Sequence, residues 1–241
     1  MTDDPRRRLD FPQLLNARDL GGCPTVDGGQ TRWRSLLRAD DLAQLDEAGL
    51  RALERYGVET VIDLRWPEEA ERLPNPVPRS LPQVRYRQLS LLTPTEEQWR
   101  LRAEDATKEL WNCVVLERVQ EELCEVLRAI AGAPPGPLLF HCFAGKDRTG
   151  LIAALLLALA DVVPAAIARD YAVSGSNLRA QYLKRYASSD PDRILAILHC
   201  PEEGAYNMLK FLARAGGVRT YLEEIGLRGQ EIAALRARLR E

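Results

Sequence analysis

The sequence predicts an α/β fold, a single domain over residues 1–241 with a central, mainly parallel sheet flanked by helices and a helical C-terminal part. Short apolar runs, which are typical of buried strands, alternate with helical segments up to about residue 150. Such alternation implies crossover connections and therefore parallel strands. A chain of 241 residues can bury one sizeable core without a second domain.

The elements before residue 90 follow from hydrophobic spacing and from turn residues. Leucines on one face predict a helix over residues 42–56, and Gly57 ends it. In chain order we expect an N-terminal arm over 1–15, a β-hairpin around the glycine turn at 27–29, this helix, a buried strand at 58–64, a short helix at 68–73 and a strand at 84–89.

Residues after 95 are predicted to be helical, apart from one apolar strand that follows Pro137. A helix over 95–131 is expected to bend near Thr107. Its apolar residues are either the inner face of a lid or plain core; they are Trp99, Leu101, Trp111, Val114 and Val115. Beyond residue 150, helix breaks are expected near Pro164, Gly175, Pro191, Gly204 and Gly216.

The composition indicates an ordinary globular protein and argues against several functional classes. Hydrophobic residues make up 46% and charged residues 28%, and the formal net charge is −2. Without a basic excess, nucleic acid is not an expected partner. The apolar run at 151–160 is too short to span a bilayer, and the N-terminus lacks a signal-peptide pattern. We expect a cytoplasmic protein without a membrane span; export without a signal peptide and the oligomeric state stay open.

The cysteines and histidines predict neither disulfides nor a metal site. Five cysteines without paired spacing fit a reducing compartment, and with only two histidines a zinc site is not expected. No cofactor is predicted. Four of the cysteines are interpreted as buried thiols: Cys23, Cys113, Cys124 and Cys200.

The most informative segment is a polar loop between the apolar strand after Pro137 and a strongly apolar helix. It begins at Cys142 and ends at Arg148. If the loop forms a ring, its backbone N–H groups and the positive end of the next helix converge where an anion of the size of phosphate fits. Arg148 would hold that anion through two N–H groups, and Cys142 would be favoured as a thiolate. A thiolate beneath a bound phosphate is a nucleophile aimed at phosphorus.

Other interpretations of this loop fit its residues less well. A Walker-type nucleotide loop needs Ser or Thr directly after Gly-Lys, whereas Asp147 follows Lys146 here. A buried structural cysteine is the usual fate of a free thiol, but it does not account for Arg148 at the start of a helix. A sulfur-transferring rhodanese domain also has a cysteine in an anion-binding loop, but the Arg-Thr-Gly ending favours a phosphatase.

The motif at 141–150, His-Cys-x5-Arg-Thr-Gly, resembles the signature loop of the cysteine-dependent protein tyrosine phosphatase superfamily. Its interior is similar to that of the dual-specificity and phosphoinositide phosphatases. The motif NARDLGG at 16–22 resembles the bacterial and fungal tyrosine phosphatase 3 family of atypical tyrosine/serine phosphatases, as do VIDLR at 61–65 and YLEEIGL at 221–227. The resemblance spans nearly the whole chain and implies a phosphomonoester hydrolase that works without metal.

The motif residues receive roles through this resemblance. Cys142 would be the nucleophile, and the loop residues Phe143, Ala144, Gly145, Lys146, Asp147 and Arg148 would bind phosphate. Thr149 would donate to the cysteine sulfur, and Lys146 would add charge at the rim of the pocket or be a solvated surface residue. His141 would hold the loop backbone, with supporting roles for Asn16, Arg18, Asp19 and Arg65. Segment 196–213 is a lid candidate by the same resemblance.

The general acid has two candidates. Many members of the superfamily carry it as an aspartate on a loop upstream of the cysteine, but here no aspartate lies between Asp105 and Asp147. The sequence Trp-Pro-Glu at 66–68 imitates the superfamily's Trp-Pro-Asp loop far upstream, and we interpret it as coincidence. Asp147 lies within the loop, and the resemblance favours it. Asp63 ends a parallel strand, where α/β proteins place ligands; the alternative is a structural partner of Arg65 or Arg148.

Two functions of different classes remain. The first is a hydrolase that acts through a phosphocysteine on phosphotyrosine, with phosphoserine, phosphothreonine or phosphoinositides as further substrates. The second is a phosphate-recognition module that has lost most or all catalysis. Intact Cys142, Arg148 and Thr149 favour the hydrolase, whereas the missing upstream acid favours the module.

Overall fold

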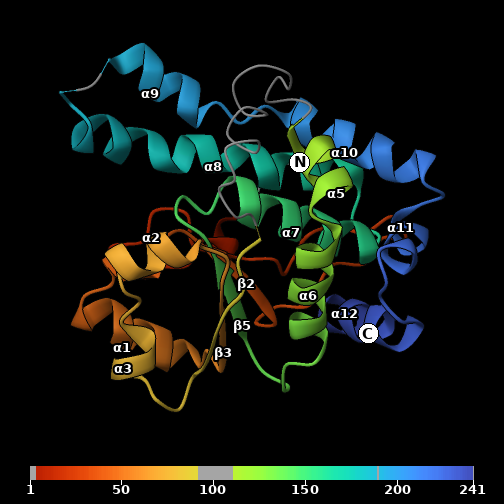
Figure 1. Ribbon diagram of the computed structural model, residues 1–241, viewed down its shortest axis with the longest axis horizontal. Helices are drawn as coiled ribbons and strands as arrows, with labels where there is room; N and C mark the ends of the chain where they lie inside the picture. The colour runs from red at the N-terminus through yellow and green to blue at the C-terminus, as the bar shows by residue number, and fades with distance from the viewer. Residues whose placement is uncertain (1–3, 92–110, 189, 241) are drawn as a thin grey trace.

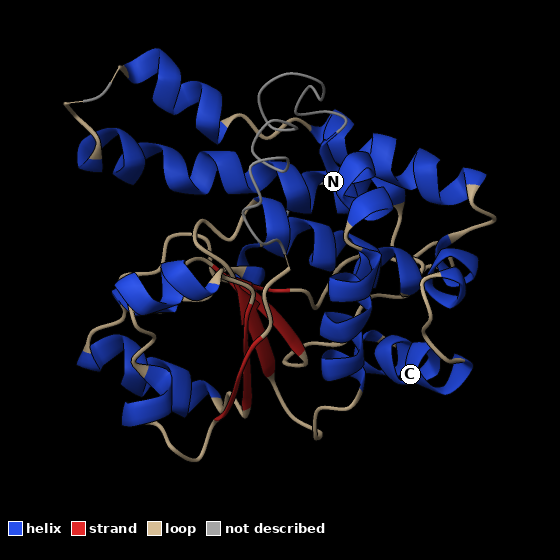
Figure 2. Cartoon of the chain, viewed as in Figure 1, coloured by secondary structure: helices blue, strands red, loops and turns tan. Residues whose placement is uncertain are grey.

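The computed structural model of the protein describes residues 4–91, 111–188 and 190–240. A five-stranded sheet lies at its centre, in the order β1-β2-β5-β3-β4 (Figure 2). Strand β1 is antiparallel to β2, and all other neighbours are parallel. The predicted α/β class is confirmed. The strands are β1 (Arg18–Asp19), β2 (Leu36–Ala39), β3 (Thr60–Asp63), β4 (Arg85–Gln88) and β5 (Leu138–His141).

Helices cover both faces of the sheet. Helices α1, α2 and α3 lie on one side, and α5, α6, α7, α11 and α12 on the other, while α8 and α9 run side by side across the top in Figure 1. The helices are η1 (Pro5–Arg7), η2 (Leu42–Gln44), α1 (Glu47–Tyr56), α2 (Pro67–Arg72), α3 (Val77–Ser80), α5 (Trp111–Arg118), α6 (Gln120–Ala131), α7 (Asp147–Leu159), α8 (Pro164–Arg185), α9 (Pro191–Leu198), α10 (Glu202–Arg214), α11 (Val218–Glu224) and α12 (Gly229–Leu239).

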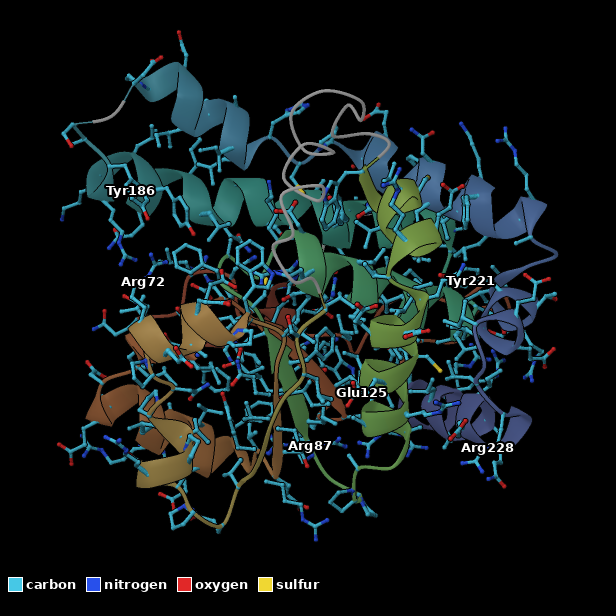
Figure 3. The ribbon with its side chains drawn as sticks, in the orientation of Figure 1. Arg72, Arg87, Glu125, Tyr186, Tyr221 and Arg228 are labelled. Atoms are coloured by element: carbon cyan, nitrogen blue, oxygen red, sulfur yellow. The ribbon has the colours of Figure 1, made fainter. Side chains whose placement is uncertain are left out.

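The alternation of side chains along the strands divides the core in two. Leu37 and Leu139 face the smaller cluster with α1 and α3, whereas Leu138 and Phe140 face the larger cluster with α5, α6, α7 and α12. Tyr221, labelled in Figure 3, belongs to the larger cluster and donates its hydroxyl to the carbonyl of Leu116 at 2.8 Å. Burial on both faces explains why the central strands β3 and β5 are short, mainly apolar runs.

Several predicted elements need correction. Strand β2 was not expected; it is buried on both faces like β3 and β5, but the charged Arg38 interrupts its apolar run. The expected hairpin is reduced to an isolated bridge between Pro24 and Gln30. The helix over 42–56 is interrupted, because Asp46 caps α1 by accepting from the amide of Gly49. The first part of the helix over 95–131 lies outside the described residues, and a break falls at Val119.

Helix α8 runs through Gly175, where a break was predicted. A β-carbon at this position would lie 2.8 Å from the carbonyl oxygen of Leu198, at the end of α9. Glycine is therefore needed here for the close approach of α9 to α8 rather than for a turn. The other predicted breaks fall at or near the helix boundaries of the structure.

The register of the sheet brings three chain segments to one edge. His141 is opposite Ala39 of β2 on one side and opposite Asp63 of β3 on the other. The residues that follow these strands therefore meet at their carboxyl ends, where α/β proteins place ligands. Helix α7 also begins at this edge. None of the helices in the described residues is long and apolar enough to cross a membrane.

Candidate active site

The signature loop, residues 142–148, connects the end of β5 to the start of α7. Cys142 is 2% exposed and Arg148 is 6% exposed, so both lie inside the protein. Asp147 is the first residue of α7, and the acidic side chain is favoured by the positive end of the helix dipole. The same N-terminus favours an anion in the loop. Strand, polar loop and buried helix therefore follow one another as predicted from the sequence.

Gly145 lets the loop fold back against the end of β2. Its φ angle is +62°, and a β-carbon would lie 2.4 Å from the carbonyl oxygen of Ala39 and 2.7 Å from the amide nitrogen of Asp40. Both atoms belong to the backbone and cannot move aside cheaply. Only glycine combines this conformation with this contact.

Two side chains hold the loop's carbonyl groups from the β2 side. Asn16 donates its side-chain amide to Ala144 O at 3.1 Å and to Gly145 O at 3.0 Å. Arg38 donates through Nη2 to Gly145 O at 2.7 Å. In a trans peptide the N–H points opposite to the C=O. The amide hydrogens that follow these carbonyls therefore point away from Asn16 and Arg38, as an anion cradle requires.

A buried cluster of charges supports these two residues. Asp170 of α8 accepts from Arg18 at 3.0 Å, from Arg38 at 2.6 Å, and from Arg7, and all four side chains are at least 96% buried. Burial opposes ionisation of Asp170, but the three guanidinium groups outweigh it and hold the pKa of Asp170 well below its usual range. Burial and the neighbouring charge of Arg38 lower the pKa of Arg18 to about 10.

The supporting residues predicted from the sequence divide into two groups. Arg18 donates to the Asn16 side chain at 2.6 Å and so supports the loop indirectly, through Asn16. Asp19 does not bond to the loop; its carboxylate accepts from the amides of Gly21 and Arg34. Sequence reasoning missed Asp170, although its spacing with the small or apolar residues of α8 places it on the helix's buried face.

Arg148 is held by a second set of contacts that the sequence analysis also missed. Its Nη1 and Nη2 atoms donate to the two oxygens of Glu69 at 2.6 and 2.9 Å. The guanidinium lies 5.0 Å from the ring centroid of Trp66, and the Trp66 amide donates to Glu69 at 2.9 Å. The Trp-Pro-Glu segment at 66–68, which we interpret from the sequence as coincidence, thus forms the start of α2 and adjoins the site. Glu68 itself is exposed.

The pair between Glu69 and Arg148 is an ionised one. Burial opposes ionisation of Glu69, but hydrogen bonds and charge from Arg148 outweigh it and lower the pKa of this carboxyl. Glu69 accepts hydrogen bonds from the edge of the guanidinium that is formed by Nη1 and Nη2. This leaves the edge formed by Nε and Nη2 as the second edge that can bind an oxyanion through two N–H groups.

Asp63 is enclosed by donors. Its carboxylate accepts from Arg65 at 2.7 Å and from the hydroxyl of Tyr86 at 2.8 Å, and it lies 3.4 Å from His141 Nε2. Burial opposes ionisation, but His141 and Arg65 outweigh it and hold the pKa of Asp63 well below its usual range. Arg65 also pairs with Asp41 at 2.9 Å. These are the contacts of a structural partner of Arg65, one of the two roles left open by the sequence.

His141 and Thr149 flank the loop at its two ends. The Nδ1 atom of His141 lies 3.2 Å from the carbonyl oxygen of Cys142, in agreement with a role in holding the loop backbone. The Thr149 hydroxyl is buried and has no hydrogen-bond partner among the described residues. The carbonyl of Phe143 accepts from the amide of Asp41 at 3.1 Å, which ties the start of the loop to the segment after β2.

Lys146 differs from the prediction of a rim or surface lysine. It is 5% exposed, and its Nζ donates to the carbonyl oxygens of Ile197 at 2.5 Å and His199 at 3.4 Å. The amine also lies 3.4 Å from Asp147, whose side chain is 31% exposed. The charge of Lys146 therefore faces the end of α9, where these carbonyls have no further turn of helix to donate N–H groups to them.

The predicted lid segment contacts the loop at the end of α9. Leu198 packs in one cluster with Ala144 of the signature loop, whereas Met208 and Leu212 of α10 belong to the main core. Of the other apolar lid candidates, Val115 and Trp111 pack into that core as well, while Trp99 and Leu101 lie outside the described residues.

The remaining cysteines form no disulfides, and two of them are less buried than expected. Cys23 and Cys124 are buried, whereas Cys113 and Cys200 are half-buried. Burial raises the pKa of the Cys200 thiol to about 11. Within the described part of the chain, no group of three or more His, Cys, Asp or Glu residues is arranged to hold a metal ion.

The sequence profile of the tyrosine phosphatase family matches residues 9–241. The chain belongs to this family. The resemblance drawn from the motifs at 141–150 and 16–22 is thereby confirmed, and with it the prediction of a phosphatase enzyme.

Relatives within the family cover most of the chain. A tyrosine-protein phosphatase from Nostoc commune is 31% identical over 231 residues, which cover 85% of this chain and 74% of the relative. The triple specificity protein phosphatase PtpB from Mycobacterium tuberculosis is 29% identical over 198 residues, 70% of each chain. Among solved structures, P. aeruginosa TpbA matches 68% of this chain and 86% of its own with 21% identity and a TM-score of 0.37, and it adds nothing to the assignment.

The charge cluster predicts a large effect of a small substitution. We expect Asp170→Asn to lower the free energy of unfolding by about 3–5 kcal/mol, because breaking a buried ion pair leaves uncompensated charge. The matched control is Asp161→Asn, which removes a half-exposed carboxylate paired with Arg236 and should cost less than about 1 kcal/mol. Urea unfolding at neutral pH measures both.

The loss of unfolding free energy caused by Asp170→Asn should depend on pH. Because the pKa of Asp170 is lowered in the folded state, its contribution is complete above about pH 4, where the unfolded chain has lost this proton, and it declines as the pH falls further. The difference between wild type and Asp170→Asn should therefore shrink in acid. Equal costs for the two variants, or a difference that grows in acid, would contradict a charged role for Asp170.

Proposed function

We propose that the protein hydrolyses phosphomonoesters through a phosphocysteine intermediate, with phosphotyrosine as its main substrate group and phosphoserine, phosphothreonine or phosphoinositides as further ones. The observation that carries the proposal is the buried pair of Cys142 and Arg148 at the two ends of a loop that opens α7. The names of the relatives support it: one is a tyrosine-protein phosphatase, and another is described as having triple specificity.

In the first step, the Cys142 thiolate attacks phosphorus, the sulfur–phosphorus bond forms and the ester oxygen leaves. The loop amides and the start of α7 hold the equatorial oxygens, where charge must be stabilised in the transition state. Arg148 binds two of these oxygens through its Nε–Nη2 edge. Glu69 fixes the opposite end of the guanidinium, which turns that edge toward the loop.

We propose Asp147 as the general acid that protonates the leaving oxygen. Its side chain is 31% exposed and starts from the loop itself, so it can reach the departing group. Asp63 is ionised and enclosed by Arg65, Tyr86 and His141, and a carboxylate with a lowered pKa holds no proton to give. Its contacts therefore support a positioning role through Arg65.

In the second step, water attacks the phosphocysteine and Cys142 leaves as a thiolate. Asp147, now ionised, accepts the proton of that water. We propose that the Thr149 hydroxyl donates to the departing sulfur, since it has no other partner among the described residues. No step requires a metal or an organic cofactor. The alternative, a module that only recognises phosphate, would share the first binding event but not the turnover.

The proposal is tested directly by Cys142→Ser. A serine hydroxyl lacks the acidity and the nucleophilicity of a thiol, so turnover of p-nitrophenyl phosphate should be lost while circular dichroism and oxyanion binding persist. A variant that keeps a tenth of the wild-type rate would contradict the covalent mechanism. Oxyanion binding by a wild-type protein that turns over no phosphoester would instead favour the recognition module.

The acid is tested by the dependence of rate on leaving group. We expect Asp147→Asn to slow hydrolysis of alkyl phosphates by about 10²–10⁴-fold and to affect esters of acidic phenols far less, because a good leaving group needs no proton. Asp63→Asn should slow all esters alike, through disturbance of Arg65. If only Asp63→Asn steepens the dependence on the leaving group's pKa, the acid is Asp63.

The orientation of Arg148 is tested at Glu69. Glu69→Gln removes the charge that fixes the guanidinium, and we expect vanadate to bind about tenfold or more weakly and kcat/KM to fall in parallel. The neighbouring Glu68→Gln is the matched control, since this side chain is exposed, and it should leave both quantities unchanged. Tighter vanadate binding by Glu69→Gln would instead show that Glu69 competes with the oxyanion for Arg148.

A further inference from the structure

A pocket of about 470 Å³ opens beside the signature loop, between the segment that follows β2 and the C-terminal half of α8. Phe143 of the loop forms part of its wall, so the pocket is continuous with the proposed phosphate site. Leu15 and the ring of Tyr182 add apolar surface, and Tyr182 packs in one cluster with Ala144 of the loop. Gln13, Gln44 and Gln181 line the remainder, and the amide nitrogen of Gln13 also donates to Asp46 at 3.1 Å.

The inner wall carries two carboxyl groups that are committed to the protein. Asp40 accepts from the amides of Leu15 and Asn16 at 2.9–3.1 Å, and Asp41 pairs with Arg65 at 2.9 Å. The second oxygen of Asp41 is buried and has no hydrogen-bond partner among the described residues. An acceptor in this state favours a neighbouring donor and disfavours a second anion.

The outer wall carries two cations, Lys184 and Arg185, in the last turn of α8. Both are exposed and lie on the pocket wall, and neither forms an ion pair within the described part of the chain. Tyr186, labelled in Figure 3, marks the end of this helix. Positive charge also stabilises a helix C-terminus, so the cations alone do not define a site. The second observation is their place on the wall of a pocket that reaches the signature loop.

We propose that this pocket binds the polypeptide next to a phosphorylated tyrosine and selects substrates with an acidic residue there. The inference rests on the proposed function and names its substrate class. The apolar surface of Leu15, Phe143 and Tyr182 accepts a flanking side chain, and the glutamine amides can both donate to and accept from a peptide backbone. Lys184 and Arg185 attract the acidic group at the outer end.

The distribution of charge favours a peptide over a phosphoinositide head group. A second phosphate in the pocket would lie near Asp40 and Asp41, whose carboxyl oxygens already act as acceptors and add no cation to that wall. A peptide places an uncharged backbone with N–H donors at that wall and its acidic side chain farther out. The pocket therefore accommodates a peptide at both its inner and its outer end, whereas it accommodates a phosphoinositide head group only at the outer end.

The test compares three substrates: p-nitrophenyl phosphate, a phosphotyrosyl peptide with aspartates on both sides of the phosphotyrosine, and the same peptide with asparagines. For the wild type we expect a higher kcat/KM with the aspartate peptide. The double variant Lys184→Gln/Arg185→Gln should lose about three- to tenfold on the aspartate peptide and keep its rates on the other two. Arg179→Gln, an exposed cation on α8 outside the pocket, is the matched control and should change nothing.

Three results would overturn the proposal: equal loss on all three substrates, equal loss in the control, or no loss on the aspartate peptide. A loss confined to a short-chain phosphatidylinositol phosphate, measured in parallel, would assign the cations to a lipid head group instead. Failure of the proposed function is seen separately, as absent turnover of p-nitrophenyl phosphate by the wild type. In that event, equilibrium binding of the two peptides with a non-hydrolysable phosphonate still decides between the pocket and an unselective surface.

Discussion

The geometry of the site depends on one buried carboxylate. Asp170 forms ion pairs with Arg7, Arg18 and Arg38, which come from the N-terminal arm, from β1 and from β2. Two of these arginines then fix the loop, Arg38 directly at Gly145 O and Arg18 through Asn16. Loss of the one carboxylate would leave three buried cations without an ion-pair partner in this cluster, which is strongly destabilising. Segments far apart in the sequence are thereby locked around a short loop, which gains the rigidity an anion cradle needs.

Arg148, the arginine that we propose binds the anion, is also held in place by neighbouring side chains. Glu69 and Trp66, which follow β3, hold one end and one face of the Arg148 guanidinium. The end of α9 closes over the loop through Lys146 and Leu198. In our proposal, few residues touch the substrate, but catalysis also relies on several residues that do not. These residues orient Arg148 and the loop amides, and a misoriented donor stabilises the transition state less.

Sequence analysis identified the functional residues that lie in recognisable motifs. It missed residues whose role depends only on where the fold places them. The loop from Cys142 to Arg148 was predictable, since strand, polar loop and apolar helix are local patterns, and so were the strand before it and the helix after it. Glu69 lies in a helix whose charged residues look like ordinary surface. The spacing along α8 places Asp170 on its buried face, but only the fold shows which arginines Asp170 and Glu69 meet. Strand β2 was missed because the charged Arg38 interrupts its apolar run, although the strand is as buried as β3 and β5. The direction of the Lys146 side chain depends on α9, which no local pattern places beside the loop.

A crystal structure with bound vanadate tests the central claim most directly. We expect vanadium within bonding distance of the Cys142 sulfur, its equatorial oxygens held by the loop amides and by the Nε–Nη2 edge of Arg148, and the Glu69 pair retained. The contacts of Asn16 and Arg38 with the loop should also be unchanged. An oxyanion bound elsewhere, or one that displaces Glu69 from Arg148, would contradict a site that is organised before the substrate arrives.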